Sequence, residues 1–171
     1  MFSRRIGSKS LCMSSRLQAS RQLTVNIVVV GSKQKTDTWI TLGIDVFESR
    51  LKPIMKLNTV YVKNDQQLIK TWNDIKMKGK GGDIGDGVRI ALDENGIENT
   101  SHEFHKIFYK GIESSGSTIS FAIGGANGLP VEIKKSSSYV LSLSKMTWTH
   151  QMARLLLIEQ IYRSSEIQKV S

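Results

Sequence analysis

Short apolar runs alternate with stretches of helical periodicity along the sequence. This alternation limits the folds that the chain can adopt more than any other feature of the sequence does. The first run, Leu23–Val30, reads LTVNIVVV and ends at a glycine. Such β-branched runs are typical of a strand buried on both faces of a parallel sheet. From Thr38 to Leu51, apolar residues recur at three- and four-residue steps until Pro53, which indicates an amphipathic helix. This order of elements predicts an α/β fold with a parallel sheet.

The alternation continues to the C-terminal end of the chain. We expect further strands at residues 59–62, 88–92, 118–123 and 139–143, and helices at residues 64–78, 100–112, 130–135 and 150–166. Thr100 and Glu103 have the spacing of a capping box, and Pro130 suits a first helical turn. Residues 78–87 carry five glycines among lysines and aspartates, which predicts a mobile surface loop. We therefore expect one domain over residues 23–171.

Residues 1–22 differ in composition from the rest of the chain. They are rich in serine and arginine and contain no acidic residue, which is typical of an organellar transit peptide. A disordered basic arm that contacts RNA directly is the alternative. Nowhere does the chain reach the roughly 18 to 20 consecutive apolar residues that a membrane-spanning helix needs, so we expect no membrane insertion. The single cysteine, Cys12, lies in this segment, so residues 23–171 offer no thiolate ligand and no cysteine nucleophile.

The chain is basic, with a formal net charge of +9. Such a charge favours a polyanionic partner such as RNA. The leader contributes five of these positive charges and no negative one, so residues 23–171 carry only +4. The predicted domain is therefore mildly basic.

Three loops are candidates for a ligand site, because ligands of open parallel sheets bind outside the carboxyl ends of the strands. These loops are residues 92–96, 124–128 and 144–149. The glycines of GGANG in the second loop let backbone amides approach a ligand, but the same sequence also suits a tight strand-to-helix turn. The loop matches neither a P-loop nor a dinucleotide fingerprint, which disfavours a nucleoside triphosphate site.

The third loop combines hydroxyls, a lysine and a tryptophan just before a helix N-terminus, where free amides can hold an anion. Ordinary helix capping by Thr147 or Thr149 is the alternative. His150 could be a general base or an RNA contact, although a histidine at a helix start is more often structural.

Other polar residues have simpler interpretations. Arg154, Glu159 and Arg163 recur near four-residue spacing, so a solvated, salt-bridged helix face accounts for them. His102 and His105 lie three residues apart on one helix with no third ligand nearby in sequence. We therefore expect no metal site.

Two segments, FAIGGANGLP and SYVLSLSKMTWTHQMARLLLIEQIYR, closely resemble the RlmH (YbeA-like) family of SPOUT superfamily rRNA methyltransferases. That family carries an IGG-x-x-GL turn and an LS-x-x-T-x-x-H-x-x-x-R-x-x-x-x-EQ-x-YR run. The VVVGSK start and residues 88–93 also resemble the family, so the resemblance covers most of residues 23–163. It implies a parallel-sheet SPOUT fold with a C-terminal deep trefoil knot, and a homodimer.

The resemblance also implies an activity and a set of residues. The implied reaction is methyl transfer from S-adenosyl-L-methionine, without a metal, to N3 of a pseudouridine in large-subunit rRNA within the ribosome. His150 and Arg154 are the implied catalytic residues nearest the RNA, with Arg154 and Arg163 pairing phosphate or bracing the dimer. The cofactor would contact Leu92, Gly124, Leu143, Ser144, Lys145, Met146, Thr147 and Trp148.

The sequence departs from the family in two places. It ends EIQKVS where relatives have a Gly-x-x-Tyr-His tail, and residues 78–87 replace the family's usual Glu-Gly-x-x-Ile/Leu helix. The alternative function is therefore a non-catalytic ribosome-binding or assembly protein that retains the SPOUT fold. The serine-rich leader, together with the family's occurrence in photosynthetic lineages, favours a plastid over a mitochondrial location.

Overall fold

Strands and helices alternate throughout the residues that the computed structural model describes, namely 23–32, 37–77, 87–114 and 117–171. One five-stranded sheet has the order β2-β1-β4-β3-β5, and all neighbouring strands are parallel. The predicted α/β class with a parallel sheet is confirmed. The strands are β1 (Leu23–Val30), β2 (Met55–Val62), β3 (Val88–Glu98), β4 (Thr118–Ile123) and β5 (Tyr139–Ser142). The helices are α1 (Thr38–Leu51), α2 (Asp65–Met77), α3 (Ser101–Ser114), α4 (Val131–Lys135) and α5 (His150–Val170).

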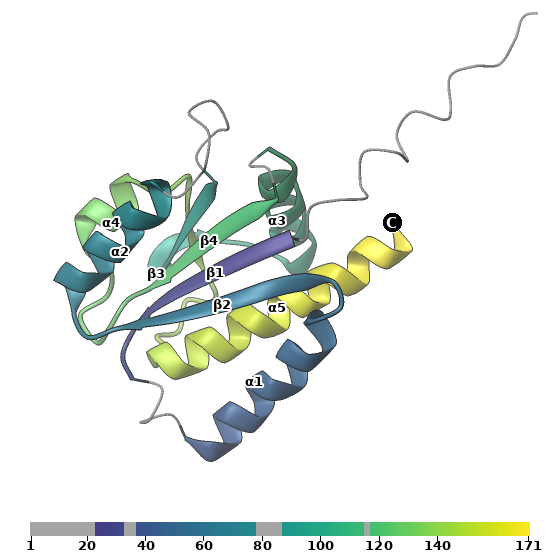
Figure 1. The fold of residues 1–171 in the computed structure, drawn as a ribbon, viewed down its shortest axis with the longest axis horizontal. Coiled ribbons are helices and arrows are strands. Elements are labelled where there is room, and N and C mark those ends of the chain that lie inside the picture. The colour runs from purple at the N-terminus through teal and green to yellow at the C-terminus, as the bar shows by residue number, and fades with distance from the viewer. Residues whose placement is uncertain (1–22, 33–36, 78–86, 115–116) are drawn as a thin grey trace, which may run out of the picture.

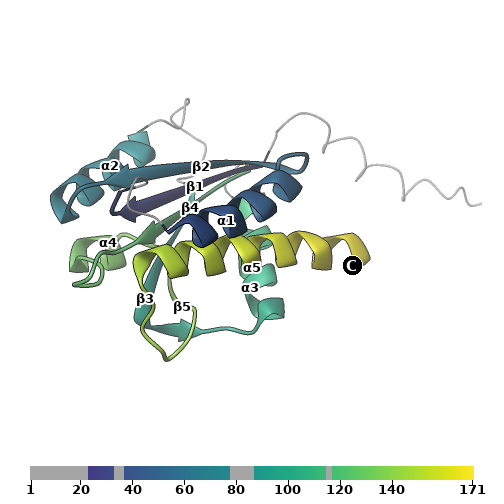
Figure 2. The same cartoon turned by 90° about the horizontal axis from the view of Figure 1, so that it is seen from below.

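Helices cover both faces of the sheet, which gives the molecule three layers (Figures 1 and 2). One face packs against α1, α3 and α5 around a large apolar core that includes the stacked rings of Phe108 and Phe121. The other face packs against α2 and α4 around Trp72 and Leu68. Each large side chain buried in these layers stabilises the fold by about 1.5–3 kcal/mol. The apolar runs of the sequence thus supply both faces of the sheet.

Several elements are longer than the sequence indicated, among them β2 and α5. Strand β2 begins at Met55 rather than residue 59, because polar side chains along it are paired across the sheet. Asn58 donates to Asn26 at 3.0 Å, and Asn26 donates to Ser120 at 3.4 Å. Helix α5 continues past residue 166 to Val170. None of the helices in the described residues is long and apolar enough to span a membrane. The loop predicted at residues 78–87 lies outside the described residues except for Gly87.

Strand β3 does not end at Leu92 as expected. Leu92 and Ile97 both register with Leu141 of β5, so residues 93–96 form a bulge between them, here called the β3 bulge. Gly96 in the bulge lies so close to β5 that an added Cβ would be 2.5 Å from the carbonyl carbon of Leu141. Because backbone atoms cannot move aside as a side chain can, only glycine fits at this position.

We predict that Gly96→Ala destabilises the protein by about 1–3 kcal/mol, since it forces β5 away from β3. The free energy of unfolding, measured in urea, checks this. Gly125→Ala is the matched control, because the added Cβ there would lie 3.2 Å from a movable methyl group of Val30. Equal stability of the two variants would contradict the close backbone contact.

Candidate functional site

Three segments meet at the carboxyl ends of β3, β4 and β5, as predicted for a ligand site of a parallel sheet. They are the β3 bulge, the glycine turn at 124–128, and residues 143–149, here called the last loop. Polar contacts tie the bulge region to the last loop and to α4. Thr147 donates to Oε2 of Glu94 at 2.8 Å, and Lys145 lies 3.8 Å from Glu98. Lys134 of α4 pairs with Asp93 at 2.8 Å.

A pocket of about 260 Å³ opens beside these segments, between β3, β5, α3 and α5. Leu92, Leu143 and Trp148 line it, and these are three of the residues predicted to contact a cofactor. Gly124 and residues 144–147, which were predicted with them, do not line this pocket. The remaining lining residues are Asn99, Ser101, Phe104, Leu141, Ser142, Leu156 and Gln160. Apolar walls with a few polar groups are typical of a small-molecule site.

Sequence analysis missed the polar wall of this pocket. Ser101 donates to the side-chain oxygen of Gln160 at 2.9 Å, which joins the start of α3 to the middle of α5. Leu156 and Gln160 lie four residues apart and therefore face the same side of α5. That spacing is the signal that could have assigned Gln160 to a surface shared with apolar residues.

The last loop is held by its own hydroxyls, while its side chains remain accessible. Ser142 donates to the carbonyl oxygen of Ser144 at 2.7 Å, and the Met146 N–H donates to the Ser144 hydroxyl at 2.8 Å. The side chain of Met146 is 66% exposed and that of Trp148 is 38% exposed. Exposed residues of this size mark a surface that a ligand or partner can cover.

Helix capping accounts for one threonine of the last loop. Thr149 accepts a hydrogen bond from the Met152 N–H and caps α5, as one of the two interpretations predicted. Thr147 instead donates across to Glu94. The Thr100–Glu103 capping box of α3 also forms, with Thr100 N–H to Glu103 at 2.8 Å and Glu103 N–H to Thr100 at 3.2 Å.

The glycine turn is as tight as its structural interpretation required. An added Cβ at Gly124 would lie 2.3 Å from the carbonyl oxygen of Gly128, and Gly128 has a φ of +77°. The Gly128 N–H donates to the Gly125 carbonyl at 3.1 Å. Both glycines are therefore required by the backbone, whether or not a ligand approaches them.

Asp93 is a nearly buried carboxylate at the start of the bulge, with a side chain only 5% exposed. Burial raises its pKa, but the hydrogen bond and charge of Lys134 and the Asn95 N–H together outweigh that effect. The net result is a pKa below the ordinary value of 3.8. Asp93 is thus ionised at neutral pH and anchors α4 to the bulge.

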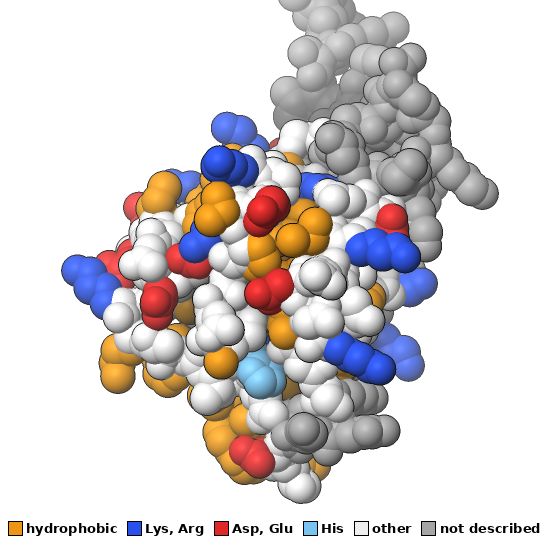
Figure 3. Space-filling view, turned by 90° about the vertical axis from the view of Figure 1, so that its left-hand side faces the viewer, with side chains coloured by type: hydrophobic (Ala, Val, Ile, Leu, Met, Phe, Trp, Pro, Cys, Tyr) orange, Lys and Arg blue, Asp and Glu red, His pale blue; other side chains and the backbone are white. Residues whose placement is uncertain are grey.

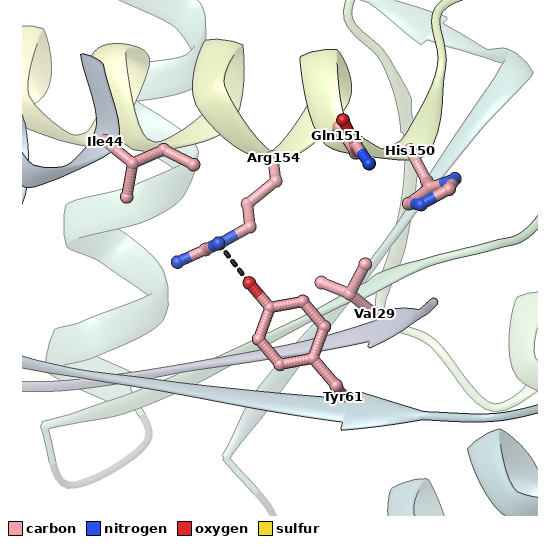
Figure 4. A pocket seen from close by; sticks show the side chains of 6 residues that line it. All are labelled: Val29, Ile44, Tyr61, His150, Gln151 and Arg154. Atoms are coloured by element: carbon pink, nitrogen blue, oxygen red, sulfur yellow. Dashed lines mark hydrogen bonds between the residues drawn. The ribbon is translucent and has the colours of Figure 1, made fainter. Parts of the chain in front are cut away.

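Arg154 lies inside the protein rather than on a solvated face, which corrects one sequence interpretation. Its side chain is buried, and its guanidinium donates to the hydroxyl of Tyr61 on β2 (Figure 4) and to Glu48 on α1 at 3.1 Å. The guanidinium also lies 5.3 Å from the centre of the Tyr61 ring. Partners on α1 and β2, which helical spacing cannot reveal, draw this arginine inward. Arg163 and Glu159 do form the predicted surface ion pair.

His150 begins α5 and lies beside Gly31, at the carboxyl end of β1. An added Cβ at Gly31 would be 2.8 Å from Nε2 of the imidazole. His150, Gln151 and Arg154 line a shallow pocket with Val29 and Tyr61 (Figure 4). His150 and Arg154 therefore face α1 and β2, away from the larger pocket lined by Trp148.

His105 is partly buried, and the surface near the site carries charges of both signs. His105 bonds the Ser164 carbonyl at 3.1 Å and packs on Tyr109, which is a structural role. No group of three potential metal ligands occurs among the described residues. Acidic, basic and apolar side chains intermix on the face in Figure 3, which looks onto the carboxyl ends of the strands. That face offers no continuous basic surface, in keeping with the mild charge of residues 23–171.

Comparison with known proteins identifies related sequences over nearly the whole described region. The family described as "Predicted SPOUT methyltransferase" matches residues 23–171. Ribosomal RNA large subunit methyltransferase H of Protochlamydia amoebophila (strain UWE25) is 36% identical over 87% of this chain and 96% of that protein. The protein of the same name from Dictyoglomus thermophilum is 34% identical over 86% of this chain and 96% of its own length.

A solved structure is similar at a lower level. It is the SpoU methyltransferase AviRb from Streptomyces viridochromogenes in complex with the cofactor AdoMet, which superimposes with a TM-score of 0.45 and 13% sequence identity. The superposition covers 84% of this chain but only 60% of that chain.

The depressed pKa of Asp93 predicts a pH dependence of stability. Its folded-state pKa is below the unfolded value, so its contribution is present above about pH 4 and is lost as the pH falls further. We expect Asp93→Asn to lower the free energy of unfolding at pH 6 but to have little effect near pH 2. Urea unfolding at both pH values measures this, with the exposed Asp74→Asn as control. A pH-independent effect of Asp93→Asn would refute the charge argument.

Proposed function

Because the chain belongs to the SPOUT methyltransferase family, among relatives named ribosomal RNA large subunit methyltransferase H, we propose that it is an S-adenosylmethionine-dependent rRNA methyltransferase. We propose N3 of a pseudouridine in large-subunit rRNA, within the ribosome, as its target. The observation that carries the proposal is the pocket at the carboxyl ends of β3 and β5. Its walls include Leu92, Leu143 and Trp148, which the family motifs assign to the cofactor.

The residues present fit S-adenosylmethionine. Leu92, Leu143 and Trp148 supply apolar and aromatic walls suited to a flat ring, while Ser142 and Gln160 supply polar atoms beside them. The exposed last loop lies beside this pocket and lines it through Leu143 and Trp148. When bound, the cofactor supplies a methyl group on a positively charged sulfur, and no metal is needed for that chemistry.

The chain's own contribution is orientation and exclusion of water. Apolar walls remove water from around the transferred group, and a fixed pocket holds the reacting partners in line, which can supply much of the rate enhancement. The target's ring proton must leave or be masked. His150 is partly exposed at the start of α5 and faces away from the pocket of its own chain. We propose that it contacts the target at the pocket of a second copy in a homodimer and accepts that proton there.

We assign Arg154 a bracing role in the same mechanism. Its guanidinium joins α5 to α1 through Glu48 and to β2 through Tyr61, so it fixes the helix that begins with His150. Glu48 is partly exposed, so the stabilisation comes mainly from the contacts of the buried guanidinium with Tyr61. Arg163, which is exposed, remains our candidate for phosphate contact.

We also propose a homodimer formed through α1 and α5, which lie side by side in Figures 1 and 2. Trp39, Leu42 and Val46 are 60%, 61% and 46% exposed, and their spacing puts them on one face of α1. The partly buried Met152 and Leu155 of α5 are neighbours of this helix. An apolar face of this kind is costly in water unless a second copy covers it.

Two further features belong to the proposal. We propose that the C-terminal segment forms a deep trefoil knot, as the resemblance of its motifs to the SPOUT methyltransferase family implies. We also propose that residues 1–22 are a transit peptide that directs the protein to an organelle, with a plastid favoured over a mitochondrion. Their basic, serine-rich and acid-free composition supports this.

The enzyme proposal predicts methyl transfer from labelled S-adenosylmethionine to ribosomes of a bacterial strain that lacks this modification. Label should appear at a pseudouridine of large-subunit rRNA. Leu143→Trp should abolish both cofactor binding and transfer, because the larger ring fills the pocket. Leu143→Met nearly keeps the side-chain volume, so its activity should stay within about three-fold of that of the wild type.

Circular dichroism of both Leu143 variants separates a blocked pocket from a lost fold. If the folded wild-type protein transfers no label, the enzyme proposal is wrong. A non-catalytic ribosome-binding protein would then be the better description, and sedimentation with ribosomes would test it.

The dimer proposal predicts that Leu42→Glu converts the protein to a monomer, because it buries a charge in the apolar face of α1. Sedimentation velocity gives the mass directly. Val131→Glu, at an equally exposed apolar residue on α4, is the matched control and should leave the dimer intact. A wild-type protein that sediments as a monomer at micromolar concentration would sink the proposal.

A further inference from the structure

The last loop borders the pocket through Leu143 and Trp148, and two carboxylates outside the loop contact it. Glu94 accepts a hydrogen bond from the Thr147 hydroxyl at 2.8 Å, and Glu98 lies 3.8 Å from Nζ of Lys145. Both carboxylates come from the part of β3 beyond Leu92, where the sequence predicted that the strand had ended. Thr147 and Lys145 belong to the residues that the family motifs place on the cofactor.

The two contacts differ in strength. The Lys145–Glu98 pair is long and both side chains are well exposed, so water screens most of its attraction. The Thr147–Glu94 contact is exposed as well, but at 2.8 Å it has the length of a formed hydrogen bond. Glu94 is therefore the main external tie of the last loop.

The position of Glu94 is fixed from both sides. Asp93 before it is pinned to Lys134, and the Asn95 N–H after it donates to Asp93 at 3.1 Å. Gly96 is pressed against the backbone of Leu141. A carboxylate on so constrained a segment can hold a mobile partner without moving itself.

We propose that Glu94 is a positioning residue that latches the last loop shut over the bound cofactor by accepting the hydrogen bond from Thr147. The proposal rests on the proposed cofactor-binding function. The latch slows release of the cofactor by stabilising the closed loop, while the pocket walls determine what is bound.

The test measures release of labelled S-adenosylmethionine from the full-length protein after a chase with excess unlabelled cofactor. Glu94→Ala should speed release on the order of 5- to 10-fold, the size expected for the loss of one typical hydrogen bond. Thr147→Val should have the same effect, and the double variant should release no faster than either single variant. Glu94→Gln keeps an acceptor oxygen and should stay within about two-fold of the wild type.

Glu113→Ala is the matched control, since this exposed glutamate lies at the other end of α3, away from the pocket. A purely structural role of Glu94 would lower the melting temperature and would not couple to Thr147. Unchanged release from Glu94→Ala, or effects of the two single variants that multiply, would overturn the latch while leaving the proposed function intact. A wild-type protein that binds no S-adenosylmethionine would overturn both.

Discussion

The close approach of Gly96 to the backbone of Leu141 is the constraint on which the candidate site depends. It lets β3 continue past its last pairing with β4 and resume on β5, with the β3 bulge between. The bulge then presents Asp93 to α4 and Glu94 to the last loop. Without that contact, the walls of the pocket would have no fixed spacing. Because Gly96 has no side chain, the β3 bulge can contact both α4 and the last loop, which lie far from it in the sequence.

Much of the fold could be predicted because apolar periodicity is visible in the sequence. Strands β1 and β4 and helix α1 begin and end where the pattern indicated. The errors fall where polar residues continue an element, as at Lys56 and Asn58 in β2 and residues 93–98 in β3. A polar residue in a strand can face solvent, as Lys56 does, or pair across the sheet, as Asn58 does, and no local pattern encodes which of the two occurs.

The candidate site was also predictable in part, although not from apolar periodicity. The rule for open parallel sheets located the three loops, and the family motifs added the individual residues. The polar wall of Ser101 and Gln160 was missed, because it forms only when α3 and α5 pack together. Arg154 was placed on the wrong side of α5, since its partners Glu48 and Tyr61 precede it by about a hundred residues. Pairing between charged groups that lie far apart in the sequence cannot be predicted from local spacing.

The distribution of pocket residues along the chain has a consequence for biosynthesis. Leu92 and Phe104 are made well before Leu141, Trp148 and Gln160, which close the other side of the pocket. A nascent chain that has emerged only as far as β4 therefore has half a pocket and an unpaired edge on β3. The ligand site can assemble only after translation of α5, so a chain released early would expose apolar surface to chaperones and proteases instead of binding a cofactor.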